Sequence, residues 1–299
     1  MKLTKKQQKK LLQLIVLLII VIVGGYFGYD SLFAPENPPA NNHYEELPLE
    51  EYYEGAEGKT GQDLSSYLTT LSNLNFNGVD YETAKAALAD ADVDPTDDTK
   101  VLTIYSRDSV NRVWDSESWH REHVWPNSRL GVGRISESGI NQASDLHNLR
   151  AIVPSINSSR SNKVFDNQTS SDTYFPGNQD KGDVARILFY MVIKYPELSL
   201  VEPVLANDPE TNYTLAGAKM SRFSVILQWH YQDPVDDFER ARNEVIYSYQ
   251  NNRNPFIDHP EFVEMIFENE DYEGLSSTFS PNQEYVFIAI VEREKRWYM

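Results

Sequence analysis

Apolar residues recur every three or four positions in five stretches of the chain, a spacing that predicts amphipathic helices. The first stretch lies near the N-terminal end of the folded region and consists of Leu64, Tyr67, Leu68, Leu71 and Leu74. The other four lie beyond residue 180, over residues 184–195, 223–227, 238–249 and 262–267. A proline at position 196 ends the first of these, since proline has no amide hydrogen for a helix interior. The C-terminal half is therefore predicted to be mainly helical.

The middle of the chain has a different pattern. VLTIYS (residues 101–106) is β-branched, short and bounded by polar residues, which predicts a strand. EHVWP (residues 122–126) contains strand-favouring residues and ends in a proline that disfavours a helix. DLHNLRAIVP (residues 145–154) predicts a strand or extended loop running into a turn, and a helix is expected to open in the following segment with Ser155 as its N-cap. Strands followed by helices indicate a mixed α/β organisation of the α+β class.

The N-terminus predicts a membrane anchor. Five lysines precede an uncharged run of nineteen residues, LLQLIVLLIIVIVGGYFGY (residues 11–29). At about 1.5 Å rise per residue this run nearly crosses a bilayer core of about 30 Å. The lysines place the N-terminus inside and the remainder outside the cell. The alternative is a signal peptide, whose cleavage would release a secreted protein, although the run is long for one and no clear A-x-A follows.

Three regions follow from this pattern. Residues 1–29 form the predicted signal anchor, a single-pass transmembrane helix in the cell membrane. Residues 30–51 are rich in proline, asparagine and acid, which predicts a linker. Residues 52–299 contain no second linker and no internal repeat, so we expect them to form one domain, in which a catalytic insert is carried by a helical scaffold.

Composition narrows the chemistry. The chain has no cysteine, so disulfides, zinc thiolates and cysteine nucleophiles are excluded, and a metal would need histidine, carboxylate, amide or backbone ligands. Its net charge is −18. Without the five N-terminal lysines, 22 basic residues face 45 acidic ones, a net charge near −23 outside the membrane. Such a charge argues against general electrostatic capture of nucleic acid.

One segment is locally basic. Residues 112–163 contain five acids and seven basic residues, namely Arg112, Arg121, Arg129, Arg134, Arg150, Arg160 and Lys163. Cations next to histidine, asparagine and glutamate suit a phosphate, because the cations neutralise it and an imidazole can accept a proton. A solvated loop of mixed charge has the same composition, so composition alone leaves both interpretations open. If this segment binds substrate, activity should fall steeply with salt.

The same segment contains the tetrapeptide His120-Arg121-Glu122-His123, which invites comparison with zinc hydrolases. Their signatures, H-E-x-x-H and H-x-x-E-H, place two histidines on one face of a helix. The spacing here matches neither, and the flanking residues argue against a helix. The other histidines offer no second site: His43 lies in the linker, and His230 and His259 are expected to be structural.

The later part of the segment resembles a known family. DLHNLRAIVPSINSSRSN places Asn157 nine residues after Asn148, with a proline between them and Arg160 one turn later. Together with REHVWPNS it resembles the endonuclease I family of secreted bacterial nucleases, which belong to the ββα-metal (His-Me finger) group. Residues 52–64, 181–191 and 229–261 resemble the same family in the same order, so the resemblance spans residues 52 to about 265. It implies a ββα-metal finger inserted in a mainly helical domain.

The resemblance implies a catalytic set. His123 would be the general base, with a neutral fraction available near an ordinary pKa of about 6.5. Glu122 and Asn157 would hold the metal, and oxygen ligands suit Mg²⁺, with Mn²⁺ or Ca²⁺ as substitutes. Neighbouring side chains of a regular strand point to opposite faces, so bringing Glu122 and His123 to one site requires a bulge there, with which Pro126 is compatible. His120 is given no role.

The remaining assignments are coarser. An arginine should stabilise the phosphate, with Arg134 as first choice and Arg129 or Arg160 as alternatives, and Arg121 as a further substrate contact. Three residues are expected to support the site or the fold, namely Asp145, His147 and Asn148. The segment RNPFIDHP is expected to pack against the insert, with Arg253 and Asp258 paired.

The function implied is metal-dependent, sequence-nonspecific endonucleolytic hydrolysis of DNA, with RNA as an alternative substrate, leaving 5′-phosphates. The partners are nucleic acid, bound through its phosphates, and the membrane; no protein partner is implied. The alternative is a catalytically inactive cell-surface module that binds nucleic acid with the same fold, against which the intact set of Glu122, His123 and Asn157 argues.

Overall fold

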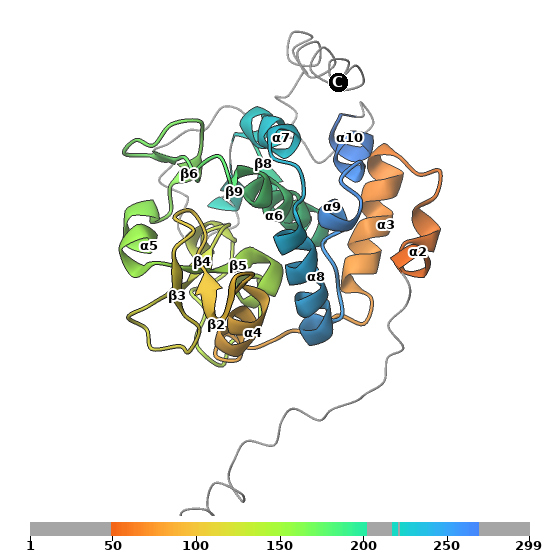
Figure 1. Ribbon diagram of the computed structural model, residues 1–299. Coiled ribbons are helices and arrows are strands. Elements are labelled where there is room, and N and C mark those ends of the chain that lie inside the picture. Colours follow the sequence, from red (N-terminus) through yellow and green to blue (C-terminus); the bar gives the residue numbers. More distant parts are fainter. Residues whose placement is uncertain (1–48, 202–216, 221, 269–299) are drawn as a thin grey trace, which may run out of the picture. The chain divides into compact units, whose positions relative to one another are not determined.

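The computed structural model describes residues 49–201, 217–220 and 222–268 (Figure 1). The chain falls into two compact units, Met1–Tyr52 and Tyr53–Met299. In the first unit the described part is helix α2 (Leu49–Tyr52). The predicted anchor and all but the last three residues of the predicted linker lie outside the described residues. Among the helices that are described, none combines the length and the apolar character needed to cross a membrane.

Helices are the main regular structure of the described second unit. They are α3 (Gly61–Asn73), α4 (Ala84–Ala91), α5 (Pro154–Arg160), α6 (Lys181–Lys194), α7 (Phe223–Gln232), α8 (Asp237–Gln250), α9 (Pro255–Asp258) and α10 (Phe262–Phe267). Single 3₁₀ turns occur at η1 (Glu54–Ala56), η2 (Asn127–Arg129), η3 (Gln142–Ser144) and η4 (Leu146–Asn148). All five predicted helical stretches are confirmed, although Leu74 lies just past the end of α3 and is exposed.

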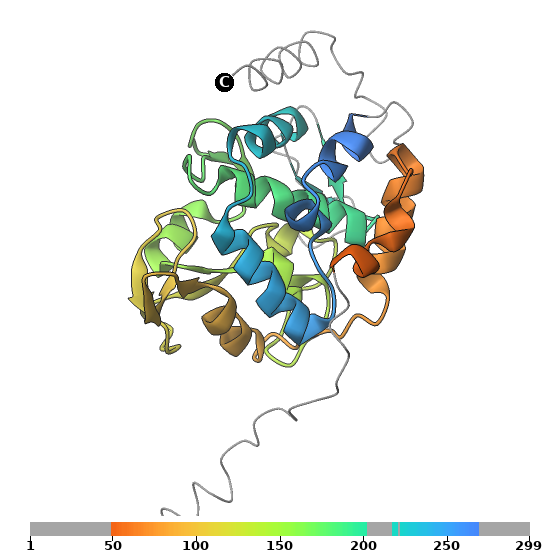
Figure 2. The ribbon, with the colours of Figure 1, turned by 45° about the vertical axis from the view of Figure 1, so that its right-hand side comes forward.

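Helix α6 is the centre of this unit (Figures 1 and 2). Every residue from Gly182 to Lys194 is buried, so the helix is surrounded on all sides. It packs against α3, α7, α9 and η4. Rings from α6, α7, α9 and α10 meet around Phe189, which contacts Phe223, Phe256 and Phe267. Helix α6 is therefore the central packing element of this unit.

The strands of the described residues are short and form four small sheets. β1 (Val93–Asp94), β2 (Asp97–Leu102) and β3 (Ser109–Asn111) are antiparallel in that order, and β4 (His120–His123) pairs with β5 (Leu149–Ile152), also antiparallel. Two parallel pairs join β6 (Val164–Phe165) to β7 (Thr173–Tyr174) and β8 (Ser199–Leu200) to β9 (Lys219–Met220). The described residues are therefore mixed and mainly helical, in agreement with the predicted α+β class.

Two predicted details are wrong. The strand expected over residues 101–106 ends at Leu102, because Tyr105 and Arg107 have positive φ angles of 72° and 54° that break the extended conformation. The cap of α5 is Val153 rather than Ser155. Pro154 takes the first helical position, where its missing amide hydrogen costs nothing and its fixed φ suits the helix.

A hydrophobic cluster fixes the β4–β5 pair to helices α4 and α8. Its buried members are Val79, Ala84, Ala87, Leu88, Ala91, Val101, Trp119, Leu146, Leu149, Ala151 and Ile246. These residues come from α4, α8, β2, η4, β5 and the connections next to them. Burial of this apolar surface contributes roughly 25 cal/mol for each Å² removed from water. The hairpin is consequently part of the main core.

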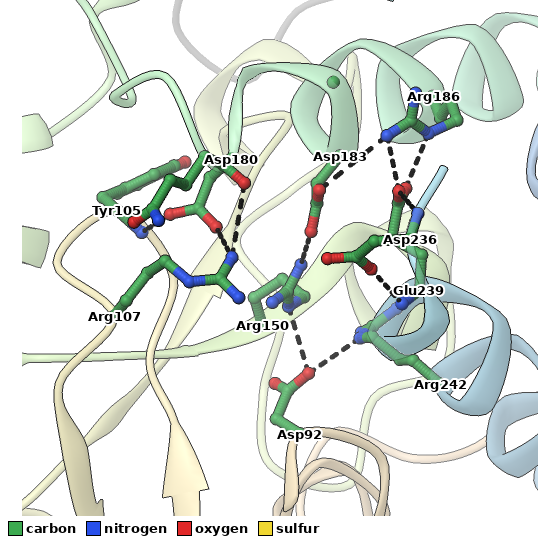
Figure 3. Close-up of polar contacts among 12 residues, drawn as sticks. Asp92, Tyr105, Arg107, Arg150, Asp180, Asp183, Arg186, Asp236, Glu239 and Arg242 are labelled. Atoms are coloured by element: carbon green, nitrogen blue, oxygen red, sulfur yellow. Dashed lines mark hydrogen bonds and ion pairs between the residues drawn. The ribbon is translucent and has the colours of Figure 1, made fainter. Parts of the chain in front are cut away.

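A chain of buried ion pairs runs behind the hairpin (Figure 3). Arg150 of β5 lies 3.0 Å from Asp92, at the end of α4, and 3.0 Å from Asp183 of α6. Asp92 also accepts a 2.8 Å hydrogen bond from Arg242 of α8, and one of 2.6 Å from the backbone amide of Ala151. Charges of alternating sign compensate one another here, which a buried charge requires. These ion pairs join β5 to the helices α4, α6 and α8.

Candidate active site

The β4–β5 hairpin presents the predicted site residues. β4 pairs one-to-one with β5, from His120 opposite Ile152 to His123 opposite Leu149. Five residues further along the chain, Asn157 lies in α5, which packs against β4. Two antiparallel strands followed by a helix therefore bring segments that are far apart in sequence next to one another.

The His123 imidazole is held by the backbone of η3. Its Nε2 atom lies 2.8 Å from the carbonyl oxygen of Ala143. A carbonyl oxygen only accepts, so Nε2 carries the proton and Nδ1 holds the free lone pair. Asn141 and Ser144 form a capping box around η3, which fixes the position of this carbonyl. The geometry selects the tautomer in which Nδ1 is a base.

Burial lowers the pKa of His123 to about 4, and the bond to Ala143 opposes this shift. The ring of Tyr81 stacks on the imidazole, with centroids 5.3 Å apart. Arg121, two residues back on the same face of β4, places its guanidinium 3.4 Å above the Tyr81 ring and donates two hydrogen bonds to Glu137, of 2.9 and 3.1 Å. The imidazole is therefore neutral at neutral pH and packed against a braced aromatic ring.

Glu122 points to the other face of β4 and is 2% exposed. Its Oε1 atom accepts a 2.9 Å hydrogen bond from the Tyr105 hydroxyl and lies 3.1 Å from Nε of Arg160. Burial raises the pKa of this carboxyl to about 7, which Arg160 and the Tyr105 hydroxyl oppose. Both partners engage the same oxygen, and no residue of the described part hydrogen-bonds to Oε2.

Asn157 completes the set. It lies one turn before Arg160 in α5, and residues three apart share a helix face, so it faces the side on which Arg160 meets Glu122. Its side-chain amide has no hydrogen-bond partner in the described part of the chain. Within those residues no group of three or more His, Cys, Asp or Glu side chains is placed to hold a metal. A carboxylate and an amide oxygen, with water and phosphate in the other positions, fit Mg²⁺.

The bulge expected in β4 is not there. Glu122 pairs with Arg150 and His123 with Leu149 in regular register. The two side chains therefore point to opposite faces, His123 toward Tyr81 and Glu122 toward Tyr105. The bulge was expected because it would bring Glu122 and His123 to one metal and phosphate; the strand instead keeps its regular pairing through His123.

Comparison with known proteins identifies the family of this chain. A sequence model of the family described as Endonuclease I matches residues 60–180 and 166–261, and these matches contain the hairpin, α5 and α6. The chain belongs to the endonuclease I family. It is a nuclease, a hydrolase by class, as the sequence resemblance implied.

Two relatives are similar over most of their length. An "Extracellular ribonuclease" of Bacillus subtilis (strain 168) is 38% identical over 258 residues, which cover 79% of this chain and 83% of the relative. A protein of the same name from Bacillus amyloliquefaciens is 37% identical over 239 residues, covering 73% of this chain and 78% of the relative.

The arginines assigned to this endonuclease I site differ sharply in accessibility. Arg134 is exposed and has no ion pair or hydrogen bond with the described residues, and its charge acts on the Tyr81 hydroxyl. Arg129 is buried and donates a 2.8 Å hydrogen bond to the carbonyl of Asn162. Arg160 is fully buried beside Glu122, and Arg121 is engaged by Glu137. Among them, Arg134 alone is open to a phosphate.

The supporting residues Asp145, His147 and Asn148 are buried. Asn148 binds both backbone groups of Trp125 just after β4, at 2.7 and 3.1 Å. Asp145 accepts hydrogen bonds from the hydroxyls of Tyr190 and Tyr195, at 2.8 and 2.9 Å, and from Gln250. Burial lowers the pKa of His147 to about 3, and its Nε2 atom lies 3.2 Å from the carbonyl oxygen of Asn252. The hydrogen bonds of all three side chains hold neighbouring segments of the domain together.

Other expectations about pairs and histidines can be placed as well. Arg253 donates a 2.7 Å hydrogen bond to Asp258, so the predicted pair within RNPFIDHP is confirmed. The His120 ring lies 3.2 Å from the carbonyl oxygen of Ser116. His259 contacts Glu261, at 3.0 Å. The remaining histidine of the described part, His230, is buried in α7, and His43 lies outside the described residues.

Sequence reasoning missed Tyr81, Tyr105 and Asp180. Tyr81 stacks on His123, and Tyr105 binds Glu122. Asp180 lies 75 residues after Tyr105 and accepts a 2.8 Å hydrogen bond from the Tyr105 backbone amide. None of the three belongs to a motif of histidine, acid and asparagine, and Tyr105 was assigned to the interior of a strand.

Proposed function

We propose that this endonuclease I protein is a metal-dependent, sequence-nonspecific endonuclease that hydrolyses phosphodiester bonds with His123 as general base. The observation that carries this proposal is the 2.8 Å contact between Nε2 of His123 and the Ala143 carbonyl, which leaves the lone pair on Nδ1. β4, β5 and α5 serve as the ββα-metal finger of a nuclease domain that spans residues 52–299.

His123 acts by removing a proton from water through Nδ1. Proton transfer by a positioned imidazole accelerates such steps by roughly 10²–10⁴. The resulting hydroxide attacks phosphorus, and the bond to the 3′-oxygen breaks, so the product carries a 5′-phosphate. Arg134, exposed and without a partner in the described residues, neutralises charge on the phosphate.

Glu122 and Asn157 would hold the metal, the first through Oε2 and the second through its amide oxygen. When bound, Mg²⁺ supplies Lewis-acid stabilisation of charge on the phosphate and the leaving oxygen. The support is a pair of oxygen donors, Oε2 of Glu122 and the Asn157 amide oxygen, that have no hydrogen-bond partner among the described residues. Arg160 of α5 and Tyr105 of the β2–β3 turn fix the other oxygen of Glu122. Mn²⁺ and Ca²⁺ share the preference for oxygen and are the natural substitutes.

The substrate class is RNA, with DNA as a second substrate. Both relatives are named as ribonucleases, which supports RNA, whereas the family description leaves both polymers open. The sequence contains no helix-turn-helix or finger pattern that would read bases, which favours cutting without sequence preference. The relatives' names also support action outside the cell, with residues 11–29 as anchor or cleaved signal.

One assay tests the proposal. The full-length protein is incubated with labelled RNA and with DNA of the same sequence, in Mg²⁺ and in EDTA. We expect Mg²⁺-dependent cleavage of RNA that leaves 5′-phosphate ends. Cleavage that persists in EDTA, or products with cyclic phosphates, would contradict the mechanism. Binding of RNA without cleavage in Mg²⁺, Mn²⁺ or Ca²⁺ would instead support the inactive binding module.

A further inference from the structure

The turn between β2 and β3 has an unfavourable backbone conformation next to Glu122. Tyr105 and Arg107 are both in the left-handed region, with φ of 72° and 54°. Residues other than glycine rarely adopt this region, because their Cβ atom comes too close to the carbonyl oxygen. Such residues persist where the surroundings over-determine them, and they cluster at functional sites.

One carboxylate holds both residues of this turn (Figure 3). Asp180, 1% exposed, accepts the Tyr105 backbone amide on Oδ2 at 2.8 Å and the Arg107 guanidinium on Oδ1 at 2.8 Å. It stands immediately before α6, the central helix. On the other side, the amide of Ile104 donates a 2.8 Å hydrogen bond to the carbonyl of Ala151 in β5. The turn is thus tied to both the helix and the hairpin.

This fixation determines where the Tyr105 hydroxyl lies. The ring packs against Phe165 and Tyr174, with centroid distances of 6.2 and 5.1 Å, and the hydroxyl donates to Oε1 of Glu122 at 2.9 Å. Arg160 meets the same oxygen at 3.1 Å. A carboxylate held through one oxygen by two partners cannot rotate freely, and its second oxygen keeps one direction.

We infer that Tyr105, fixed by Asp180, is a positioning residue that orients Oε2 of Glu122 toward the metal. This inference rests on the proposed role of Glu122 as a metal ligand. Partners that orient a ligand commonly contribute about 10–100-fold to metal affinity. The effect belongs to metal binding, because Tyr105 contacts the ligand and has no place in proton transfer at His123.

The test is a titration of the full-length, chelator-treated protein with Mn²⁺, in which electron paramagnetic resonance measures the free ion. Tyr105→Phe removes only the hydroxyl and should weaken Mn²⁺ binding about tenfold or more. Tyr174→Phe is the matched control: its ring packs on Tyr105, its hydroxyl makes no hydrogen bond to the described residues, and the affinity of this variant should equal that of the wild type. Excess Mn²⁺ should restore the nuclease rate of Tyr105→Phe.

Further variants separate the possible failures. Glu122→Gln should lose Mn²⁺ binding; if it does while Tyr105→Phe binds like the wild type, the positioning role is overturned and the proposed metal site stands. If Glu122→Gln keeps the wild-type affinity, both are overturned. Should Tyr105→Phe fail to fold, Asp180→Asn tests the same arrangement, since it removes the charge that holds Arg107 and leaves the Tyr105 hydroxyl intact. Weaker Mn²⁺ binding in Asp180→Asn supports the inference, and unchanged binding with a lower melting temperature overturns it.

Discussion

Nε2 of His123 lies 2.8 Å from the carbonyl oxygen of Ala143, twenty residues further along the chain. This contact decides which imidazole nitrogen is free to accept a proton. It depends on η3, whose capping box is formed by Asn141 and Ser144. The proposed base is therefore oriented by a short backbone segment that contains no catalytic side chain.

Arg134 is predicted to contribute to activity and not to stability. It is exposed and has no partner among the described residues, so Arg134→Ala should lower kcat/KM by about 10²-fold, the cost of losing one donor to a developing charge. Its melting temperature should stay at the wild-type value. Arg121→Ala is the contrasting variant, because Arg121 braces Glu137 and Tyr81, and it should lower the melting temperature. Full activity in Arg134→Ala would remove this residue from the mechanism.

Arg150 is predicted to be essential to the fold. It lies between Asp92 and Asp183, each at 3.0 Å, with all three side chains buried. Arg150→Met should lower the free energy of unfolding by about 3–5 kcal/mol, because two buried carboxylates each lose a counter-charge: Asp92 is left with Arg242, and Asp183 with the 3.9 Å contact to Arg186. Urea denaturation measures this directly. Lys100→Ala removes an exposed pair with Asp97 and should leave the urea midpoint unchanged; equal effects of the two substitutions would refute the prediction.

His147 is predicted to make stability fall in acid. Burial lowers its pKa to about 3, against the pull of Asp145, while Arg242 and Lys194 add to the lowering. In the unfolded chain the pKa is about 6.5, so below that pH the unfolded state takes up a proton that the folded state does not. The resulting loss of folding stability is absent above about pH 7 and grows as the pH falls toward about 3.

The comparison uses His147→Gln, whose amide can still donate to the Asn252 carbonyl. Urea unfolding between about pH 7 and pH 5 should show the wild type losing stability faster than the variant, by about 1 kcal/mol or more over that range. A constant difference between the two proteins across this range would show that His147 does not carry the effect.

Salt dependence is predicted to be shallower than the basic segment suggests. Of its seven cations, Arg121, Arg129, Arg150 and Arg160 are buried, and Arg112 pairs with Asp90. Arg134 and Lys163 remain for phosphates. With two contacts to a single strand, log K should fall against log salt with a slope of about −1.4. Fluorescence anisotropy of labelled RNA with the full-length protein, between about 50 and 200 mM salt, measures this. A slope steeper than about −4 would reveal a larger binding surface.

The sequence predicted the helices but not the contacts that surround the proposed site residues. Helical periodicity located α3, α6, α7, α8 and α10, because each buries one face or all of its surface. The family resemblance pointed to Glu122, His123 and Asn157, whose roles stay a proposal. The burial of Arg160 could not be predicted, because it depends on the Glu122 carboxylate, 38 residues away in sequence. The turn at Tyr105 was hidden too, since its positive φ is stabilised by Asp180, far along the chain.

The proposed mechanism depends on His123 removing a proton from the attacking water. Single-turnover cleavage of labelled RNA in Mg²⁺ compares the wild type with His123→Ala and with His120→Ala, whose ring lies against the Ser116 carbonyl. We expect a loss of about 10²–10⁴-fold for His123→Ala, partly restored by added imidazole, and a near wild-type rate for His120→Ala. A wild-type rate in His123→Ala would contradict it.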